Sequence, residues 1–317
     1  AQTPGYLAPW LELPGVTEQI GSWSELIGCD LLRYGTTASA DEIRDTAIAQ
    51  PLLVASAIVA AAALGNHGGM VAGHSVGELA AGAIAGIITP DDALRLVGVR
   101  GRAMAQAAAA EATSMTAVLG GDEATVLASI ERHGLTPANI NGAGQIVAAG
   151  TVEQLAAFAA EPPARARLIP LQVAGAFHTR HMAAAVDALR EAASSVRAHD
   201  PALPIASNRD GAIVRTGDDW LERICAQVSA PVRWDSCMST MSSLGATAFV
   251  ELPPAGTLVG LARRALPGVQ LLALKTPENL DAALKLIAEH AEGHSDQHAQ
   301  PLVRLQPAQL ASTEERQ

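Results

Sequence analysis

The sequence predicts an α/β protein whose larger core is interrupted by a small α+β unit. Short β-branched strands alternate with amphipathic helices before residue 110 and after residue 174, which is typical of helices packed on a sheet. Between these parts the pattern follows the order β-α-β-β-α-β, the ferredoxin-like order. The chain has 317 residues, 49% of them hydrophobic, which is enough for one large domain carrying an inserted smaller one.

We therefore expect three parts. Residues 1–110 and 174–292 form the core, residues 111–173 form a ferredoxin-like subdomain, and residues 293–317 form a disordered tail. The tail assignment rests on its mixed polar composition and its lack of hydrophobic periodicity.

Helix start signals dominate the first hundred residues. Ser39 and Glu42 have the spacing of a capping box, and Pro51 is expected at the start of a helix. Thr89 is an expected N-cap because a proline and two aspartates follow it, and this helix should end near residue 110.

The middle of the chain contains the elements of the predicted insertion. They are expected as strands at 115–119, 138–141, 145–149 and 167–173, and as helices at 122–133 and 152–160.

After Gly175 the larger pattern resumes. We expect a hairpin-like segment at 205–214 around Asp210-Gly211, strands at 247–252 and 269–274, and helices at 181–196, 218–228, 233–244, 257–266 and 280–290.

The net charge of −11 and the presence of only two lysines make nucleic acid an unexpected partner. An acidic protein partner would have to dock on a local cluster of arginines, because the overall field would repel it. Candidates for such a cluster are Arg102, Arg180, Arg209 and Arg233. For any one of them, a solvated surface arginine is the more common interpretation.

No membrane span is expected. The longest apolar stretch, residues 52–64, is mostly alanine and stops short of bilayer thickness. The three cysteines are odd in number, and no basic segment with a cleavage site opens the chain, so we expect a cytoplasmic protein.

The segment from Ala72 to Leu79 has the pattern of a nucleophile elbow, which is a strand, a serine between glycines, and a helix. Gly73 and Gly77 are expected to remove the Cβ clashes that forbid a tight turn at Ser75. The helix after the turn points free N–H groups at the serine, and the Val76 N–H is the expected oxyanion donor. A glycine-rich turn with a capping serine is the alternative interpretation.

A serine nucleophile needs a base from elsewhere in the chain, since His74 should face away from Ser75 at the turn. Among nine histidines, His178 follows a predicted strand and precedes a helix, so it lies where α/β active sites are built. An exposed loop histidine without a role is the alternative.

The motifs around these residues resemble those of the malonyl-CoA:acyl carrier protein transacylases of fatty acid and polyketide synthesis. The family's G-H-S-x-G-E hexad is present at residues 73–78, and its A-F-H motif is present at 176–178. Its arginine followed by glycine matches Arg100, its N-x-x-G-Q turn matches Asn141, and its late glutamine matches Gln227. The resemblance covers nearly the whole chain, and it implies an α/β-hydrolase-like core with a ferredoxin-like insertion.

The resemblance implies transfer of malonyl from malonyl-CoA to the phosphopantetheine thiol of acyl carrier protein. Ser75 would form a malonyl ester and His178 would act as base, oriented by a backbone carbonyl near Gln227. Asn141 is a plausible polar neighbour of the site, and a turn-forming asparagine is an equally good interpretation.

Arg100 and Phe177 would select the substrate. A guanidinium can hold the free malonyl carboxylate through two parallel hydrogen bonds, each contributing about 1.5–3 kcal/mol. Phe177 is bulky where an α-methyl branch would lie, so we expect it to exclude methylmalonyl. We expect no metal or redox cofactor, because the sequence has neither clustered Cys/His ligand spacing nor a G-x-G-x-x-G loop. We expect a monomer.

The chain departs from the family pattern at its start. Family members begin with an apolar strand leading into G-Q-G-x-Q, whereas this chain opens at Ala1 and its Gln2 matches only the last glutamine. The family's first glutamine supplies a second oxyanion donor, whose loss costs about 2.7–4 kcal/mol. The lack of an initiating methionine favours a truncated sequence over true absence of that strand.

Two alternatives remain open. A serine esterase or thioesterase would use the same elbow, but a hydrolase of neutral esters gains nothing from a buried cation at Arg100. A non-catalytic carrier-protein-binding homologue is favoured only by the missing first strand.

Overall fold

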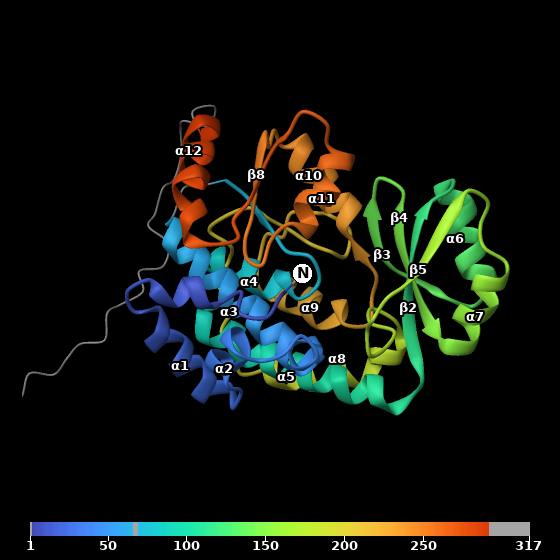
Figure 1. Cartoon of the computed structure of the whole chain (residues 1–317), viewed down its shortest axis with the longest axis horizontal. Helices are drawn as coiled ribbons and strands as arrows, with labels where there is room; N and C mark the ends of the chain where they lie inside the picture. The colour runs from blue at the N-terminus through green and yellow to red at the C-terminus, as the bar shows by residue number, and fades with distance from the viewer. Residues whose placement is uncertain (1, 66–68, 292–317) are drawn as a thin grey trace, which may run out of the picture.

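The computed structural model describes residues 2–65 and 69–291. A small lobe of green strands and helices lies beside a larger lobe, which combines the blue N-terminal helices with the orange and red C-terminal elements (Figure 1). The chain passes from the larger lobe into the smaller one and then returns. The expected tail at 293–317 lies outside the described residues.

The N-terminal part of the larger lobe is helical. The segments are η1 (Ala8–Glu12), α1 (Val16–Ile27), α2 (Leu31–Thr36), η2 (Glu42–Arg44) and α3 (Thr46–Leu64). The capping interaction between Ser39 and Glu42 is present, since the Glu42 N–H donates to Ser39 Oγ over 3.3 Å. The predicted helix start at Pro51 is wrong. Asp45 caps the helix by accepting from the Ala47 N–H at 2.8 Å, so Pro51 lies inside α3.

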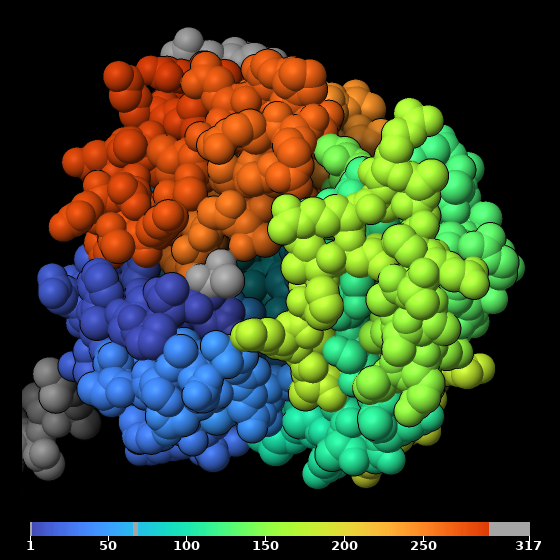
Figure 2. Space-filling view, turned by 45° about the vertical axis from the view of Figure 1, so that its right-hand side comes forward, coloured from blue at the N-terminus to red at the C-terminus, as the bar shows by residue number. Residues whose placement is uncertain are grey.

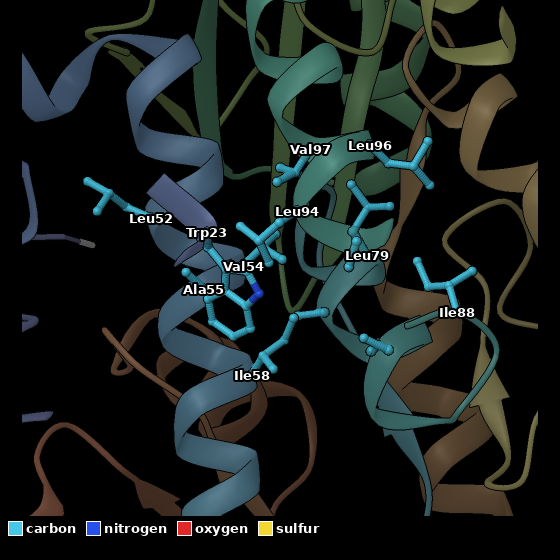
Figure 3. Packing of buried hydrophobic residues seen from close by; sticks show 14 of the residues in the cluster. Trp23, Leu52, Val54, Ala55, Ile58, Leu79, Ile88, Leu94, Leu96 and Val97 are labelled. Atoms are coloured by element: carbon cyan, nitrogen blue, oxygen red, sulfur yellow. The ribbon is translucent and has the colours of Figure 1, made fainter. Parts of the chain in front are cut away.

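Because α3 begins earlier than expected, it has 19 residues and a mean hydropathy of 2.1, which by length and composition alone would allow it to cross a membrane. A core helix passes the same test, and most of α3 is buried inside the protein. Figure 3 shows Leu52, Val54, Ala55 and Ile58 of α3 packed together with Trp23 in the main core.

The segment that follows α3 contains the elbow. Strand β1 (Val71–Ala72) precedes α4 (Gly77–Ile84), and α5 (Pro90–Ala110) follows. As predicted, Thr89 caps α5 through its side chain, which accepts from the Asp92 N–H. Leu79 of α4 and Leu94, Leu96 and Val97 of α5 belong to the same core as α3 (Figure 3). The elbow is therefore fixed against the main hydrophobic core.

The small lobe has the predicted β-α-β-β-α-β order. Its elements are β2 (Thr113–Gly120), α6 (Glu123–Arg132), β3 (Thr136–Gly142), β4 (Gln145–Thr151), α7 (Val152–Ala160) and β5 (Ala166–Pro170). The strand order is β5-β2-β4-β3, and all three pairings are antiparallel. Strand β7 (Val232–Arg233) of the larger lobe adds to β3 in parallel, so the two lobes share this sheet.

The chain then completes the larger lobe. Its remaining elements are η3 (Arg180–Met182), α8 (Ala183–Ala193), β6 (Ile205–Ala206), α9 (Gly217–Gln227), α10 (Trp234–Ser243), β8 (Ala248–Glu251), α11 (Thr257–Ala265), β9 (Gln270–Ala273), η4 (Pro277–Asn279) and α12 (Leu280–Ala291). The predicted hairpin-like segment at 205–214 is present: the Val214 N–H donates to the Ile205 carbonyl and the Ser207 N–H to the Ala212 carbonyl, both at 3.0 Å, around an antiparallel bridge between Ala206 and Ile213. On their other edge Ile205 and Ala206, both fully buried, pair with β1 in parallel.

Within the described residues, the parallel strands of the larger lobe form two separate two-stranded sheets, β1 with β6 and β8 with β9. An apolar pocket of about 710 Å³ lies against both sheets, and its lining includes Val71 of β1 and Phe249 of β8. Helices α3 and α12 contribute further lining residues, whereas Ser75, His178 and Arg100 contribute none. This pocket is therefore distinct from the site that the sequence predicts.

Candidate active site

Ser75 lies at the tight turn between β1 and α4. Its backbone φ of 54° is in the left-handed region, which residues other than glycine rarely adopt. Gly73 is required here, because a Cβ on it would lie 2.0 Å from the Gly77 carbonyl carbon. The expectation for the second glycine is wrong, since a Cβ on Gly77 would meet nothing within 4 Å.

Ser75 and His178 form a hydrogen-bonded pair. Ser75 Oγ lies 2.7 Å from His178 Nε2, and His178 Nδ1 lies 2.9 Å from the backbone carbonyl of Gln227. A carbonyl oxygen can only accept, so Nδ1 carries the proton and Nε2 of the neutral ring accepts from the serine hydroxyl. This arrangement would allow His178 to act as a base for Ser75, oriented by a backbone carbonyl rather than by a carboxylate.

Arg100 reaches the same serine from α5. Its Nη2 lies 3.2 Å from Ser75 Oγ and 2.8 Å from Gln227 Oε1, and its Nη1 donates to Gln50 Oε1. The residue is only 2% exposed, and it forms no salt bridge within the described part of the chain. Among the described residues, the guanidinium contacts only neutral groups directly, and the Glu78 carboxylate stabilises it from the far side of Gln227, so a carboxylate bound beside it would add a direct counter-charge.

Gln227 connects the three groups. Its carbonyl holds His178 and its side-chain oxygen accepts from Arg100, while Nε2 donates to the Ser75 carbonyl at 2.9 Å. Nε2 also donates to the Glu78 carboxylate. One buried glutamine therefore fixes the base, the cation and the nucleophile relative to one another.

The charges of the site follow from its burial. Burial, and then the neighbouring Arg100 guanidinium, lower the pKa of His178 to about 3. Burial lowers the pKa of Arg100 to about 10, so it stays charged at neutral pH, and burial raises the pKa of Glu78 to about 7. At neutral pH, His178 is therefore an uncharged base beside a fixed cation.

Val76 is in the position expected of an oxyanion donor. It is the N-cap of α4, and its N–H makes no hydrogen bond within residues 2–65 and 69–291. A free N–H at a helix N-terminus next to the nucleophile can stabilise a negative oxygen that forms there.

Asn141 makes no hydrogen bond to Ser75 or His178 within the described residues. Its Oδ1 lies 2.9 Å from His74 Nε2, and the His74 ring packs edge-on to Trp234 at 5.6 Å between centroids. His74 thus faces away from the serine, as expected from the turn. Phe177 is half-buried and packs against both the main core and the inner face of the small lobe.

Figure 2 shows the molecule hollowed where the orange C-terminal part, the blue N-terminal helices and the green small lobe meet. The atoms at the base of the hollow have the teal of the α4 and α5 region of the chain.

Three contributors to the site were not assigned a role from the sequence. They are Gln50, Glu78 and Asn208, all less than 8% exposed. A glutamine within the apolar run of α3 is a signal that could have identified Gln50, because a buried amide needs a partner. No pattern in the sequence singles out Asn208.

Comparison with known proteins agrees with this geometry. The profile of the "Acyl transferase domain" family matches residues 25–282. The "Malonyl CoA-acyl carrier protein transacylase" of Mycolicibacterium smegmatis is 51% identical over 284 residues, covering 87% of this chain and 98% of that protein. The protein of the same name from Escherichia coli strain K12 is 31% identical over 297 residues, covering 90% and 96%.

Two solved structures resemble this chain over most of its length. The crystal structure of MCAT from Mycobacterium tuberculosis superposes with a TM-score of 0.87 at 50% identity, covering 89% of this chain and 96% of that one. A malonyl-transacylase in complex with a holo type II PKS acyl-carrier protein has a TM-score of 0.83 at 27% identity, covering 90% and 96%.

Proposed function

This chain belongs to the malonyl CoA-acyl carrier protein transacylases of the acyl transferase domain family, and from that membership we propose how its residues perform the reaction. The protein is an acyltransferase that moves the malonyl group from malonyl-CoA to acyl carrier protein. Ser75 and His178 form the catalytic pair, and Arg100 binds the substrate carboxylate.

The reaction runs as two acyl transfers. Ser75 Oγ attacks the thioester carbonyl while His178 Nε2 takes the hydroxyl proton, and the coenzyme A thiol leaves with that proton. His178 then deprotonates the phosphopantetheine thiol of the carrier protein, which attacks the malonyl ester. The proton returns to Ser75 Oγ, and the enzyme is regenerated.

Two further groups stabilise the charges of the reacting malonyl thioester. The Val76 N–H donates to the oxyanion of each tetrahedral intermediate. The Arg100 guanidinium holds the malonyl carboxylate, which directs the thioester carbonyl toward Ser75. Gln227 orients His178 and Arg100 together, and Asn141 supports the elbow indirectly through His74.

One observation carries the assignment: a base and an unpaired cation both lie within hydrogen-bond reach of one serine oxygen, at 2.7 Å and 3.2 Å. An esterase of neutral substrates would bear the cost of burying that cation without using it. The alternatives of a serine hydrolase and a non-catalytic homologue are accordingly disfavoured.

A transfer assay tests this function. With malonyl-CoA and holo acyl carrier protein, initial velocities should give parallel double-reciprocal lines, because the serine ester separates the two half-reactions. Malonyl should appear on the carrier thiol. Release of free malonate at the rate at which coenzyme A is formed, with none on the carrier, would identify a hydrolase instead.

We also propose the finer fold assignment and the setting of the enzyme. The larger lobe is an α/β-hydrolase-like core of residues 1–110 and 174–292, and residues 111–173 are a ferredoxin-like insertion. The β5-β2-β4-β3 strand order supports the second assignment. The enzyme acts as a cytoplasmic monomer and needs no metal or redox cofactor.

The pH dependence of Ser75 acylation should lack the titration of an ordinary histidine. Since the pKa of His178 is lowered from 6.5 to about 3, the ring stays neutral and competent as a base throughout about pH 5 to 8. The measurement is kcat/KM for malonyl-CoA across that range, in the wild type and in Glu78→Gln.

Glu78 is the control because its pKa, raised to about 7, makes it change charge in the same range. Any inflection near neutral pH should disappear in Glu78→Gln. An acid limb near pH 6.5 that persists in this variant would show that His178 titrates normally, contrary to the proposal.

Phe177 should limit the size of the acyl group. Phe177→Ser is expected to allow methylmalonyl transfer, since the smaller side chain leaves room for an α-methyl branch. Acyl-enzyme formation with methylmalonyl-CoA and malonyl-CoA should be compared for the wild type and the variant. A variant that still rejects methylmalonyl would exclude this role for Phe177.

A further inference from the structure

Asn208 lies directly behind the nucleophile and belongs to no motif of the sequence. It follows β6 after one intervening residue, and its exposed fraction is 0%. Its side chain contacts the elbow, which is 133 residues earlier in the chain. A fully buried asparagine so far along the sequence from its partners must have a structural or functional reason to be there.

The Asn208 side chain bonds to both sides of the elbow. Its Oδ1 accepts from the Ser75 N–H at 2.7 Å, and its Nδ2 donates to the Gly73 carbonyl at 2.7 Å. These two bonds bracket His74, the residue between.

This is the pattern that a peptide group makes in a parallel ladder, where one residue bonds to the residues before and after its opposite number. Strands β1 and β6 pair in parallel with Val71 opposite Ile205 and Ala72 opposite Ala206. In the same register, Asn208 would stand opposite His74. Its side-chain amide therefore continues the β1–β6 pairing for one more step, at the point where the chain turns away into the elbow.

The elbow needs such a restraint. Ser75 has a left-handed φ of 54°, a conformation that a non-glycine residue keeps only where its surroundings impose it. By engaging the Ser75 N–H, Asn208 fixes the direction of that peptide group. The next N–H, that of Val76, is left without a partner and available to an oxyanion.

Glu78 holds Asn208 in turn. Its Oε1 accepts from the backbone N–H of Asn208 at 2.8 Å, and its carboxylate also accepts from the Gln227 side chain. Glu78 is 3% exposed and lies in the first turn of α4, so the helix that follows the nucleophile is tied to the strand that supports it.

We propose that Asn208 is a positioning residue for the reaction, which holds Ser75 in the geometry for attack and leaves the Val76 N–H free. This inference rests on the proposed role of Ser75 as nucleophile. It predicts a loss in the rate of the acylation step rather than in substrate affinity, because Asn208 makes no hydrogen bond to Arg100 or His178 within the described residues, and its bond from Gln227 Nε2 is long, at 3.5 Å.

The test is single-turnover acylation, followed by intact-protein mass spectrometry at increasing concentrations of malonyl-CoA. Asn208→Ala should lower the limiting rate about 100-fold, the cost of a small misplacement of a reacting group. The half-saturating concentration should stay within about twofold of the wild-type value, since the carboxylate site is intact. A limiting rate within about threefold of wild type, or a change confined to the half-saturating concentration, would overturn the inference.

A second variant covers the case in which Asn208→Ala does not fold. Asn208→Asp keeps the acceptor for the Ser75 N–H but places an acceptor oxygen against the Gly73 carbonyl, so it should acylate more slowly than wild type. Wild-type speed in Asn208→Asp would contradict the proposal.

Ser207→Ala is the matched control, because Ser207 is 2% exposed and adjacent, but its Oγ accepts from the Arg209 N–H rather than from the elbow. It should acylate at the wild-type rate, and an equal loss there would overturn the proposal by showing general disruption. A wild-type enzyme that forms no malonyl ester at Ser75 would refute the proposed function itself. A normal wild-type ester with a fast Asn208→Ala variant would refute only the role of Asn208.

Discussion

Ser75→Ala is expected to lower transfer of malonyl to the carrier protein by about 10⁴-fold or more, because no covalent intermediate can form without the hydroxyl. The substituted protein should keep its fold, since the side chain is small and its partners His178 and Arg100 are held by Gln227 as well. Malonyl-CoA should still bind, because the carboxylate site on Arg100 remains. The measurement is the transfer rate together with the dissociation constant for malonyl-CoA.

Ser129→Ala provides a control for serine removal. Ser129 is buried and lies on α6 of the small lobe, away from the elbow, and its Oγ accepts only from Arg132 among the described residues. It should transfer at the wild-type rate. Transfer by Ser75→Ala at more than a few per cent of the wild-type rate would mean that another residue carries the acyl group.

Arg100→Ala should remove the preference for malonyl over acetyl. Two charge-assisted hydrogen bonds of about 1.5–3 kcal/mol each correspond to a selectivity of roughly 10²- to 10⁴-fold, since about 1.4 kcal/mol is a factor of ten. The ratio of kcat/KM for malonyl-CoA to that for acetyl-CoA should fall by this factor. The fall should come from malonyl-CoA, because acetyl has no carboxylate for the guanidinium to hold.

Two further variants separate charge from shape. Arg100→Lys keeps the cation but cannot bond in parallel to both carboxylate oxygens, so it should recover only part of the selectivity. Arg102→Ala removes an exposed arginine from the same helix, one that donates to the Ile27 carbonyl and lies outside the site. It should leave the ratio unchanged. An unchanged ratio in Arg100→Ala would show that the carboxylate binds elsewhere.

The chemistry of the site could be predicted from local patterns. The serine and its flanking Gly73 follow β1, a parallel strand, and active sites of α/β proteins gather at the carboxyl ends of such strands. The same argument does not hold for His178, because the strand before it, β5, ends at Pro170 and is antiparallel in the small lobe, so only the A-F-H motif identifies it. Arg100 is identified only through the family's arginine-glycine motif, because the N-cap at Thr89 predicts the helix but not which of its side chains faces the site.

The supporting contacts could not be predicted in this way. Gln50 reaches Arg100 from α3, but Pro51 predicts a helix start one residue after Gln50, whereas Asp45 is the N-cap. Asn208 acts through a register between β1 and β6 that depends on two buried residues in each strand. Such pairings join distant segments, and a single sequence contains no signal for them.

The strand pairing of the larger lobe could not be predicted from the sequence either. Alternating strands and helices indicated a sheet, but they could not show that β1–β6 and β8–β9 form separate pairs with an apolar pocket against both. Strands of two to four residues are too short for their hydrophobic pattern to fix which neighbours they pair with.

The central claim is that one serine, one base and one cation act together on a carboxylate-bearing acyl group. Peptide mapping by mass spectrometry after incubation with malonyl-CoA or acetyl-CoA tests it most directly. We expect a malonyl adduct on Ser75, almost no acetyl adduct, and loss of the malonyl adduct in Arg100→Ala. A malonyl adduct on any other residue, or equal labelling by the two thioesters, would contradict the account.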